Sequence, residues 1–166
     1  MSGMAGQIKQ STPAAIESRF SEAILGSHSQ KGDETVIIKK DSIFSILKFL
    51  KEDPDQDYAF LMDLTAVDYP DRELRFEVVY HLYSMKRNAR IRLKTGVSVS
   101  DPRIESCVPL YRGASWYERE CYDMYGIIFE NHPDLRRILL YEEFQGHPLR
   151  KDYPVNKRQP LVGPEN

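Results

Sequence analysis

The acidic side chains near position 120 are the first candidates for chemistry in this sequence. Glu120 and Asp123 lie three residues apart, and His132 follows shortly afterwards. General acid–base catalysis needs ionisable groups held in different environments across a cleft. A small stand-alone hydrolase that uses Glu120, Asp123 and His132 is therefore one hypothesis. The alternative is structural, because Arg119 and Asp123 lie four residues apart and can pair along one face of a helix.

The cysteines and histidines are the candidates for metal binding or nucleophilic catalysis. The chain has two cysteines, Cys107 and Cys121, and the histidines His132 and His147 are 15 residues apart. Metal sites usually present ligand pairs two to five residues apart, and an iron–sulfur cluster usually takes four thiolates. Neither spacing fits, and the phosphate-binding and nucleophile-elbow glycine motifs are missing from the sequence. We therefore expect no catalytic, cofactor-binding or metal-binding residue on this chain.

Two similar segments in the last third of the sequence remain to be explained. HPDLRR (132–137) and HPLRKD (147–152) each place His-Pro ahead of a leucine and a basic pair. Proline fixes the backbone, and arginines can form bidentate hydrogen bonds with carboxylates. One interpretation is that Arg136, Arg137 and Arg150 pair with acids of this chain. The other is that the tail lies along a neighbouring protein and becomes ordered there.

The elements that position these residues belong to a chain of ordinary composition. It has 166 residues, of which 41% are hydrophobic and 29% charged, and its formal net charge is −2. These values indicate one folded domain and exclude a wholly disordered chain. The balanced charge does not indicate nucleic-acid binding. The N-terminus lacks the basic and apolar stretches of a signal peptide, so a cytoplasmic location is expected.

Hydrophobic periodicity predicts helices and strands in the first hundred residues. The expected elements are a helix at 12–26 opened by Thr12-Pro13, a loop at 27–33, a strand at 35–39, a helix from Asp41 that ends before Pro54, a buried strand at 58–67, and a hairpin of strands at 73–83 and 90–94. Asp41 is the expected cap of the second helix. Leu74, Phe76, Val78, Tyr80 and Leu82 share the buried face of the hairpin.

The sequence of the rest of the chain predicts one helix followed by short apolar runs. The expected elements are a short helical or irregular segment at 101–109, a helix from Ser115 to Gly126 with Ser115 and Glu118 as a capping box, strands at 127–129 and 138–140, and an extended tail from Gly146. Together these predict an α+β fold with a mixed or antiparallel sheet and helices on one face. The expected division is a flexible N-terminus (1–11), a domain (12–145) and an interface tail (146–166).

Residues 35–155 also resemble a known family. WYERECYDMYGIIF (116–129), HPDLRRILL (132–140) and GHPLRKDYP (146–154) occur in order, and residues 63–95 are similar as well. Together they resemble the C subunit of the proton-pumping NADH:quinone oxidoreductase, respiratory complex I, whose mitochondrial counterpart is the 30-kDa subunit. The resemblance implies a non-catalytic member of the peripheral arm that packs on the large quinone-site protein, the D subunit.

The resemblance also implies partners and a location. The neighbours would be the large quinone-site subunit and two iron–sulfur proteins, the B and I subunits, on the cytoplasmic face of the bacterial inner membrane or its matrix-side equivalent. Membrane contact would occur only through partners. The complex would use iron–sulfur clusters, quinone, FMN and NADH, with none of them on this chain. The equivalent component of an energy-converting hydrogenase or of a plastoquinone-reducing complex is the alternative within the resemblance.

The motifs that carry the resemblance also identify candidate residues, by their positions in this sequence. Trp116, Glu118, Arg119, Glu120, Asp123 and Gly126 would form the helix framework. The full set of interface candidates is Trp116, Glu118, Arg119, Glu120, Asp123, His132, Pro133, Arg136, Arg137, Gly146, His147, Pro148, Arg150, Lys151, Asp152, Tyr153 and Pro154.

Overall fold

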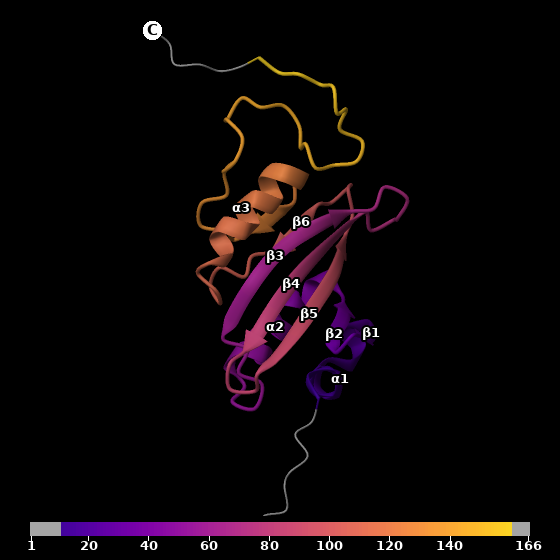
Figure 1. Ribbon diagram of the computed structural model, residues 1–166, viewed down its shortest axis with the longest axis vertical. Coiled ribbons are helices and arrows are strands. Elements are labelled where there is room, and N and C mark those ends of the chain that lie inside the picture. The colour runs from indigo at the N-terminus through magenta and orange to yellow at the C-terminus, as the bar shows by residue number, and fades with distance from the viewer. Residues whose placement is uncertain (1–10, 161–166) are drawn as a thin grey trace, which may run out of the picture.

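The computed structural model describes residues 11–160, and Figure 1 shows the arrangement of their helices and strands. The helices are α1 (Thr12–Phe20), α2 (Ile43–Glu52) and α3 (Ala114–Tyr125), and short 3-10 turns cover Ser21–Ala23 and Lys40–Ser42. The strands are β1 (Ile24–Gln30), β2 (Asp33–Ile38), β3 (Phe60–Asp68), β4 (Phe76–Ser84), β5 (Ala89–Val97), β6 (Arg103–Glu105) and β7 (Ile128–Glu130). Residues 1–10 of the expected N-terminal segment and 161–166 of the expected tail lie outside the described residues.

A mixed sheet with strand order β1-β2-β5-β4-β3 forms the centre of the fold. Strand β4 pairs antiparallel with both β3 and β5, while β2 pairs parallel with β5. The predicted hairpin is confirmed: the chain turns at Asn88, which has φ 48° and accepts a hydrogen bond from the Tyr83 hydroxyl at 2.8 Å. The expected α+β fold with a mixed sheet is therefore confirmed.

The hydrophobic core lies between one face of the sheet and the helices. Val78, Tyr80 and Leu82 of β4 alternate along the strand and are fully buried, as period-two patterning requires. Helix α2 lies behind the sheet in Figure 1 and buries its apolar stripe of Ile43, Ile46, Leu47 and Leu50. Helix α3 lies beside β3 and adds Ala114 and Cys121 to the same core.

The predicted N-terminal elements need correction. Helix α1 ends at Phe20, and the segment expected to be a loop at 27–33 is mostly strand β1, which pairs antiparallel with β2. Gly26 lies within this strand and does not end the helix. Ser11 is the N-cap of α1. Thr12, which was expected to open the helix as its cap, instead bonds the Tyr58 hydroxyl in the core through its own hydroxyl at 2.8 Å. Pairing with β2 therefore determined the extended conformation of residues 24–30, against the local sequence signals for a helix and a loop.

Three smaller predictions were also wrong. Asp41 lies in the 3-10 turn before α2, and no side chain caps that helix. Leu74 precedes β4 and is 46% exposed, because the chain bends there and lays its side chain over Gly96. The segment at 103–105, expected to be helical or irregular, is strand β6, which pairs parallel with β7. Pairing with a distant strand, which local sequence does not encode, explains β6.

Among residues 11–160, no helix combines the length and apolar character that crossing a bilayer requires.

Candidate functional site

The segment after α3 folds back over this helix, and we call residues 132–153 the C-terminal clasp. Its main anchor is the buried carboxylate of Asp123. One oxygen accepts the backbone N–H groups of Ile138, Leu139 and Leu140 at 3.0, 2.8 and 2.9 Å. The other accepts the Arg137 guanidinium at 2.6 Å. The expected strand at 138–140 is therefore wrong, since these N–H groups bond a side chain.

Two arginines complete the first half of the clasp. The Arg137 guanidinium also donates to the carbonyl oxygens of Phe144 and Gly146, at 2.8 and 3.2 Å. Arg119 of α3 donates to the carbonyl oxygens of Arg136 and Arg137, at 3.1 and 2.9 Å. The expected pairing of Arg119 with Asp123 is therefore not seen, because Arg137 takes the carboxylate.

A second buried carboxylate holds the far end of the clasp. Asp68 at the end of β3 forms a bidentate ion pair with Arg75, at 2.7 and 2.8 Å, and accepts the backbone N–H of Lys151 at 2.7 Å. Arg75 also pairs with Asp152 at 2.9 Å. Charge-assisted hydrogen bonds of this kind are among the stronger polar contacts in proteins. Asp68 and Arg75 were not predicted as site residues from the sequence, where only their position across the β3–β4 turn suggests this pair.

The second His-Pro segment packs against the C-terminus of α3. The Nδ1 of His147 donates to the Asp123 carbonyl oxygen at 2.9 Å, and the Arg150 guanidinium donates to the Tyr125 carbonyl oxygen at 2.6 Å. Gly126 ends α3 with φ 74°, the left-handed conformation that favours glycine. A Cβ atom at this position would lie 2.5 Å from both His147 and Arg150. The helix end and the clasp therefore fit together only around a glycine.

Glu118 has a different role from the predicted one. Helix α3 begins after Gly113 without a side-chain cap, so the capping box of Ser115 and Glu118 is wrong. The Glu118 carboxyl is instead fully buried and accepts the Ser106 hydroxyl and the Cys107 N–H, both at 2.7 Å. Burial raises the pKa of Glu118, while these two hydrogen bonds lower it less. Glu118 ties α3 to the segment after β6.

The residues of the hydrolase hypothesis do not form a cleft. Asp123 is occupied by the clasp. His132 Nε2 contacts the Ser115 carbonyl oxygen at 3.3 Å, and its Nδ1 accepts the Asp134 N–H at 3.0 Å, so both ring nitrogens are engaged. Both cysteines are buried, and burial raises the pKa of both thiols well above its ordinary value. Within the described part of the chain, no group of three His, Cys, Asp or Glu could hold a metal ion.

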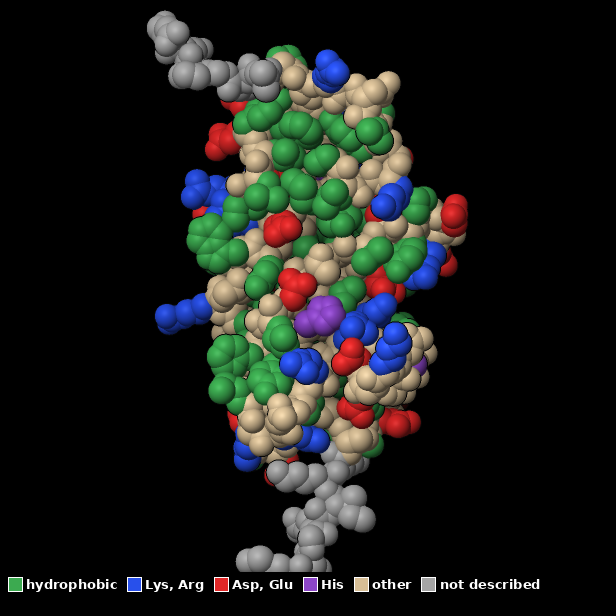
Figure 2. Space-filling view, viewed as in Figure 1, with side chains coloured by type: hydrophobic (Ala, Val, Ile, Leu, Met, Phe, Trp, Pro, Cys, Tyr) green, Lys and Arg blue, Asp and Glu red, His purple; other side chains and the backbone are tan. Residues whose placement is uncertain are grey.

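Helix α3 and the clasp also present side chains to the solvent. Trp116 and Leu139 are 63% and 62% exposed, and Leu149 is exposed as well. Arg136 is exposed and, among residues 11–160, its side chain pairs only with Asp134, at 3.0 Å. Figure 2 shows hydrophobic side chains gathered over the part of the molecule that holds α3 and the C-terminal segment. Exposed apolar side chains in one region are typical of protein–protein contact surfaces.

The seventeen residues expected at an interface therefore divide by exposure. Glu118 and Asp123 are buried, and the half-buried set is Arg119, His132, Arg137, His147, Pro148, Arg150 and Tyr153. The outward-facing set is Trp116, Glu120, Pro133, Arg136, Gly146, Lys151, Asp152 and Pro154. The first two groups mostly build the clasp, and the third faces solvent, although Asp152 also pairs with Arg75. Arg137 pairs with an acid of this chain, whereas Arg150 bonds a carbonyl oxygen.

The clasp should loosen on acidification. Burial raises the pKa of Asp123, but the hydrogen bonds from Leu140, Arg137, Leu139 and Ile138 outweigh it and hold that pKa below its ordinary value. The hydrogen bond from Arg75 lowers the pKa of Asp68. The ionised forms thus stabilise the fold above the unfolded-state pKa of about 4, and this stability is lost as pH falls through the folded-state values.

The histidines should lower the free energy of unfolding at a higher pH than the carboxylates do. Burial lowers the pKa of His81, His132 and His147, so protonation favours the unfolded state below about pH 6.5. We expect the free energy of unfolding, measured by urea denaturation, to fall from pH 7 to 5 and again below pH 4. His147→Asn, which keeps a donor for the Asp123 carbonyl, should reduce only the first fall. A free energy of unfolding that is flat from pH 7 to 5 would contradict this account.

Comparison with known proteins places this arrangement in a family. Residues 36–159 match the model of the respiratory-chain NADH dehydrogenase 30 kDa subunit. The NADH-quinone oxidoreductase C subunit of Citrifermentans bemidjiense is 46% identical over 150 residues, which cover 89% of this chain and 92% of that protein. The C subunit of Parvibaculum lavamentivorans is 49% identical over 134 residues, which cover 81% of this chain but only 66% of that longer protein.

Solved structures share the fold. The trypsin-resistant fragment (1–134) of Nqo5 superposes with a TM-score of 0.64 at 29% identity, over 74% of this chain and 98% of the fragment. A chain of an archaeal membrane-bound sulfane sulfur reductase gives a TM-score of 0.72 at 23% identity, over 87% of this chain and 84% of that one, which shows the fold alone. The family match begins within β2, leaves out β1, and covers β3, β4, β5, α3 and the whole clasp. The chain therefore belongs to the family of the respiratory-chain NADH dehydrogenase 30 kDa subunit.

Proposed function

We propose that this chain is a non-catalytic structural component of the peripheral arm of a proton-translocating NADH-quinone oxidoreductase. Its relatives at 45–49% identity are named as the C subunit of that enzyme. The titratable groups of the candidate site support a structural role, because Asp123, His132 and His147 bond backbone groups or Arg137. Electrons would pass through neighbouring subunits, and this chain would hold those subunits in fixed relative positions.

The observation that carries the proposal is the way the clasp is built. Two buried carboxylates, Asp123 and Asp68, fix the backbone of the clasp on the domain. The side chains of Trp116, Arg136 and Leu139 are left facing solvent. Tryptophan and arginine on a rigid support are the residue types that contribute most to binding energy at interfaces. This surface is the proposed contact with the large quinone-site subunit.

The proposal extends to the neighbours and the location. The iron–sulfur proteins of the arm, the B and I subunits, would lie next to the same surface, and the chain would reach the cytoplasmic face of the inner membrane only through these partners. The iron–sulfur clusters, FMN and quinone of the complex would be held by other subunits. An equivalent place in an energy-converting hydrogenase or a plastoquinone-reducing complex is the alternative, and the fold shared with the sulfane sulfur reductase chain is compatible with it.

Purification of the complex from membranes tests the proposal. The full chain carries an affinity tag, and the complex is isolated after mild detergent extraction. We expect stoichiometric co-purification of the other peripheral-arm subunits, together with NADH-dependent quinone reduction. A complex with hydrogenase subunits and without an NADH-oxidising module would support the alternative. Recovery of the tagged chain alone, with hydrolytic turnover, would overturn the assignment.

Substitution of the exposed anchors should weaken assembly without unfolding the domain. We expect Trp116→Ala and Arg136→Ala each to cost about 2 kcal/mol of association free energy, which corresponds to roughly thirtyfold weaker binding. The measurement is the amount of assembled peripheral arm on native gels, with circular dichroism of the purified chain to check folding. The matched controls Met85→Ala and Lys39→Ala, exposed on other parts of the surface, should assemble like the wild type. Normal assembly of both anchor variants would exclude this surface as the contact.

A further inference from the structure

Strand β3 exposes apolar side chains that the fold of this chain does not use. The run at 58–67 is apolar enough to predict a buried strand, yet Phe60 and Met62 are 54% and 46% exposed. Trp116 on the neighbouring helix is 63% exposed. Three large exposed apolar side chains on adjacent elements need a physical reason, because water contact with them is unfavourable.

Helix α3 and strand β3 contact each other along a regular line, which we call the seam. The Tyr117 hydroxyl donates to the Met62 carbonyl oxygen at 3.2 Å, and the Cys121 thiol contacts the Leu64 carbonyl oxygen at 3.9 Å. Four residues of a helix rise about 6 Å and two residues of a strand about 6.7 Å, so the two repeats match. The helix thus lies along β3, the last strand of the sheet, and both elements expose side chains beside their contact.

Two carboxylates flank this seam, one on each element. Asp63 lies between Met62 and Leu64 on β3, and Glu120 directly precedes Cys121 on α3. The pKa of Cys121 is raised first by burial and then by nearby carboxylates that include Glu120 and Asp63, which agrees with their positions on either side of the contact. Among residues 11–160, neither carboxylate has a hydrogen-bond or ion-pair partner, unlike Asp68 and Asp123.

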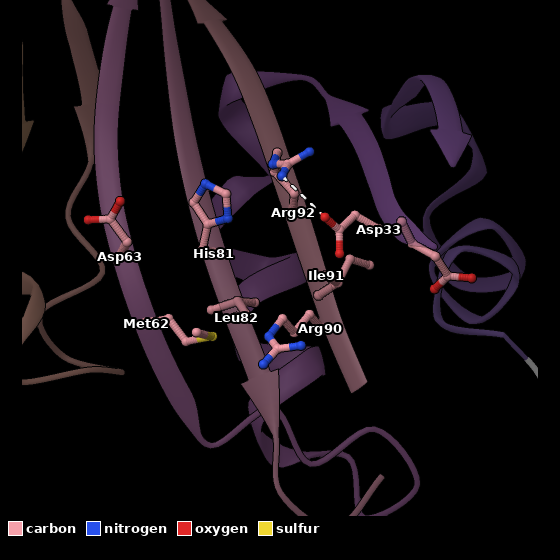
Figure 3. A pocket seen from close by; sticks show the side chains of 9 residues that line it. Asp33, Met62, Asp63, His81, Leu82, Arg90, Ile91 and Arg92 are labelled. Atoms are coloured by element: carbon pink, nitrogen blue, oxygen red, sulfur yellow. Dashed lines mark ion pairs between the residues drawn. The ribbon is translucent and has the colours of Figure 1, made fainter. Parts of the chain in front are cut away.

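The two arginines that line one hollow together with Asp63 already have other partners. Figure 3 shows Asp63, His81 and Arg92 in a row across β3, β4 and β5, beside a depression of about 280 Å³ that Met62 and Arg90 also line. Arg92 donates to the Thr35 hydroxyl at 3.2 Å and lies 4.0 Å from Asp33, and the Arg90 guanidinium lies 5.4 Å above the Tyr83 ring. Asp63 is therefore a half-buried acid at the rim of this hollow, opposite His81 of β4, and it forms no ion pair with Arg90 or Arg92.

We propose that this seam surface (Phe60, Met62, Asp63, Trp116 and Glu120) binds a segment of a neighbouring protein of the complex that carries an arginine or lysine among apolar side chains. The basic side chain would lie between Asp63 and Glu120, and its apolar neighbours would cover Phe60, Met62 and Trp116. Charge complementarity selects this occupant, because an acidic segment or an anionic lipid surface would be repelled by both carboxylates. The inference rests on the proposed function and specifies the chemistry of one contact within it.

Charge reversal tests the inference. In the assembled complex, the double variant D63K/E120K places two positive charges against the proposed basic residue. We expect at least about tenfold less complex at low salt, and a smaller difference from the wild type at high salt, because salt screens both the repulsion in the variant and the attraction in the wild type. The neutral pair D63N/E120Q should lie between this variant and the wild type. Glu73→Lys, which reverses an exposed acid on the β3–β4 turn, is the matched control and should assemble normally.

Cross-linking identifies the occupant directly. A photo-reactive amino acid at Met62 should cross-link within the purified complex to one peptide of another protein of the complex that contains Arg or Lys and apolar residues. The same group at Met85, which is 68% exposed on the β4–β5 turn, should give no cross-link to that peptide. A cross-link from Met62 to a second copy of this chain, to lipid, or to a peptide without Arg or Lys would overturn the inference.

The two proposals fail in different ways. If the wild-type chain does not purify with NADH-quinone oxidoreductase subunits, the proposed function is wrong. If the wild type does so and D63K/E120K assembles equally well at every salt concentration, the proposed function stands and the seam surface is not a charged contact.

Discussion

Asp123→Ala should release the C-terminal clasp from helix α3. The substitution leaves the backbone N–H groups of Ile138, Leu139 and Leu140 without their acceptor and leaves the largely buried Arg137 guanidinium without its counter-charge. Removing one partner of a buried, hydrogen-bonded ion pair costs roughly 3–5 kcal/mol. We expect the opening free energy of the clasp to fall by about 3 kcal/mol. Trypsin cleavage after Arg136 and Arg137 should then accelerate by roughly a hundredfold.

Limited proteolysis followed by mass spectrometry measures this effect. The matched control is Asp134→Asn, because Asp134 pairs with Arg136 on the surface, where both side chains are more than half exposed. Surface ion pairs contribute about 0–1 kcal/mol, so the cleavage rate of the control should change only a few-fold. Equal cleavage rates for Asp123→Ala and the wild type would show that the carboxylate does not hold the clasp.

Gly126→Val should disrupt the same region from the end of the helix. Gly126 has φ 74°, and a β-branched residue in the left-handed region is strained by about 1–2 kcal/mol. The new Cβ atom would also lie 2.5 Å from His147 and Arg150, which cannot both stay in place. The combined loss of free energy of unfolding should be about 3 kcal/mol. Urea denaturation of the purified variant measures it.

Glycine at the other end of α3 provides the control. Gly113 has φ −64°, and a Cβ atom placed on it meets nothing within 4 Å. Gly113→Ala should therefore leave the free energy of unfolding within about 0.5 kcal/mol of the wild type. If Gly126→Val were as stable as Gly113→Ala, the close approach of the clasp to the helix end would be incorrect.

Local sequence signals predicted the elements whose residues pack with near neighbours. The β4–β5 hairpin follows from alternation around Asn88, and α2 follows from the apolar stripe of Ile43, Ile46, Leu47 and Leu50. Strands β1 and β6 were missed because each forms by pairing with another strand, β2 or β7. Their own side chains, such as Ser27 and His28 in β1, carry no strand pattern.

The candidate site shows the same limit at the level of single residues. Spacing along the helix suggested that Asp123 pairs with Arg119, and His-Pro loops suggested contacts outside the chain. The structure brings Asp123 to Arg137, 14 residues away, and Asp68 to Lys151, 83 residues away. A buried carboxylate takes whichever donors the fold brings to it, because leaving it unpaired is costly.

The amino-acid order alone determined the family, the α+β class and the regular elements with strong periodicity, because these depend on residue type and short-range spacing. Only the tertiary structure decided which polar side chains form contacts inside the domain and which face the solvent. Arg137 and Arg136 are adjacent and identical in type, yet one is held by Asp123 and the other faces solvent. The physical reason is burial, which arises from contacts between residues far apart in the chain and has no local signature.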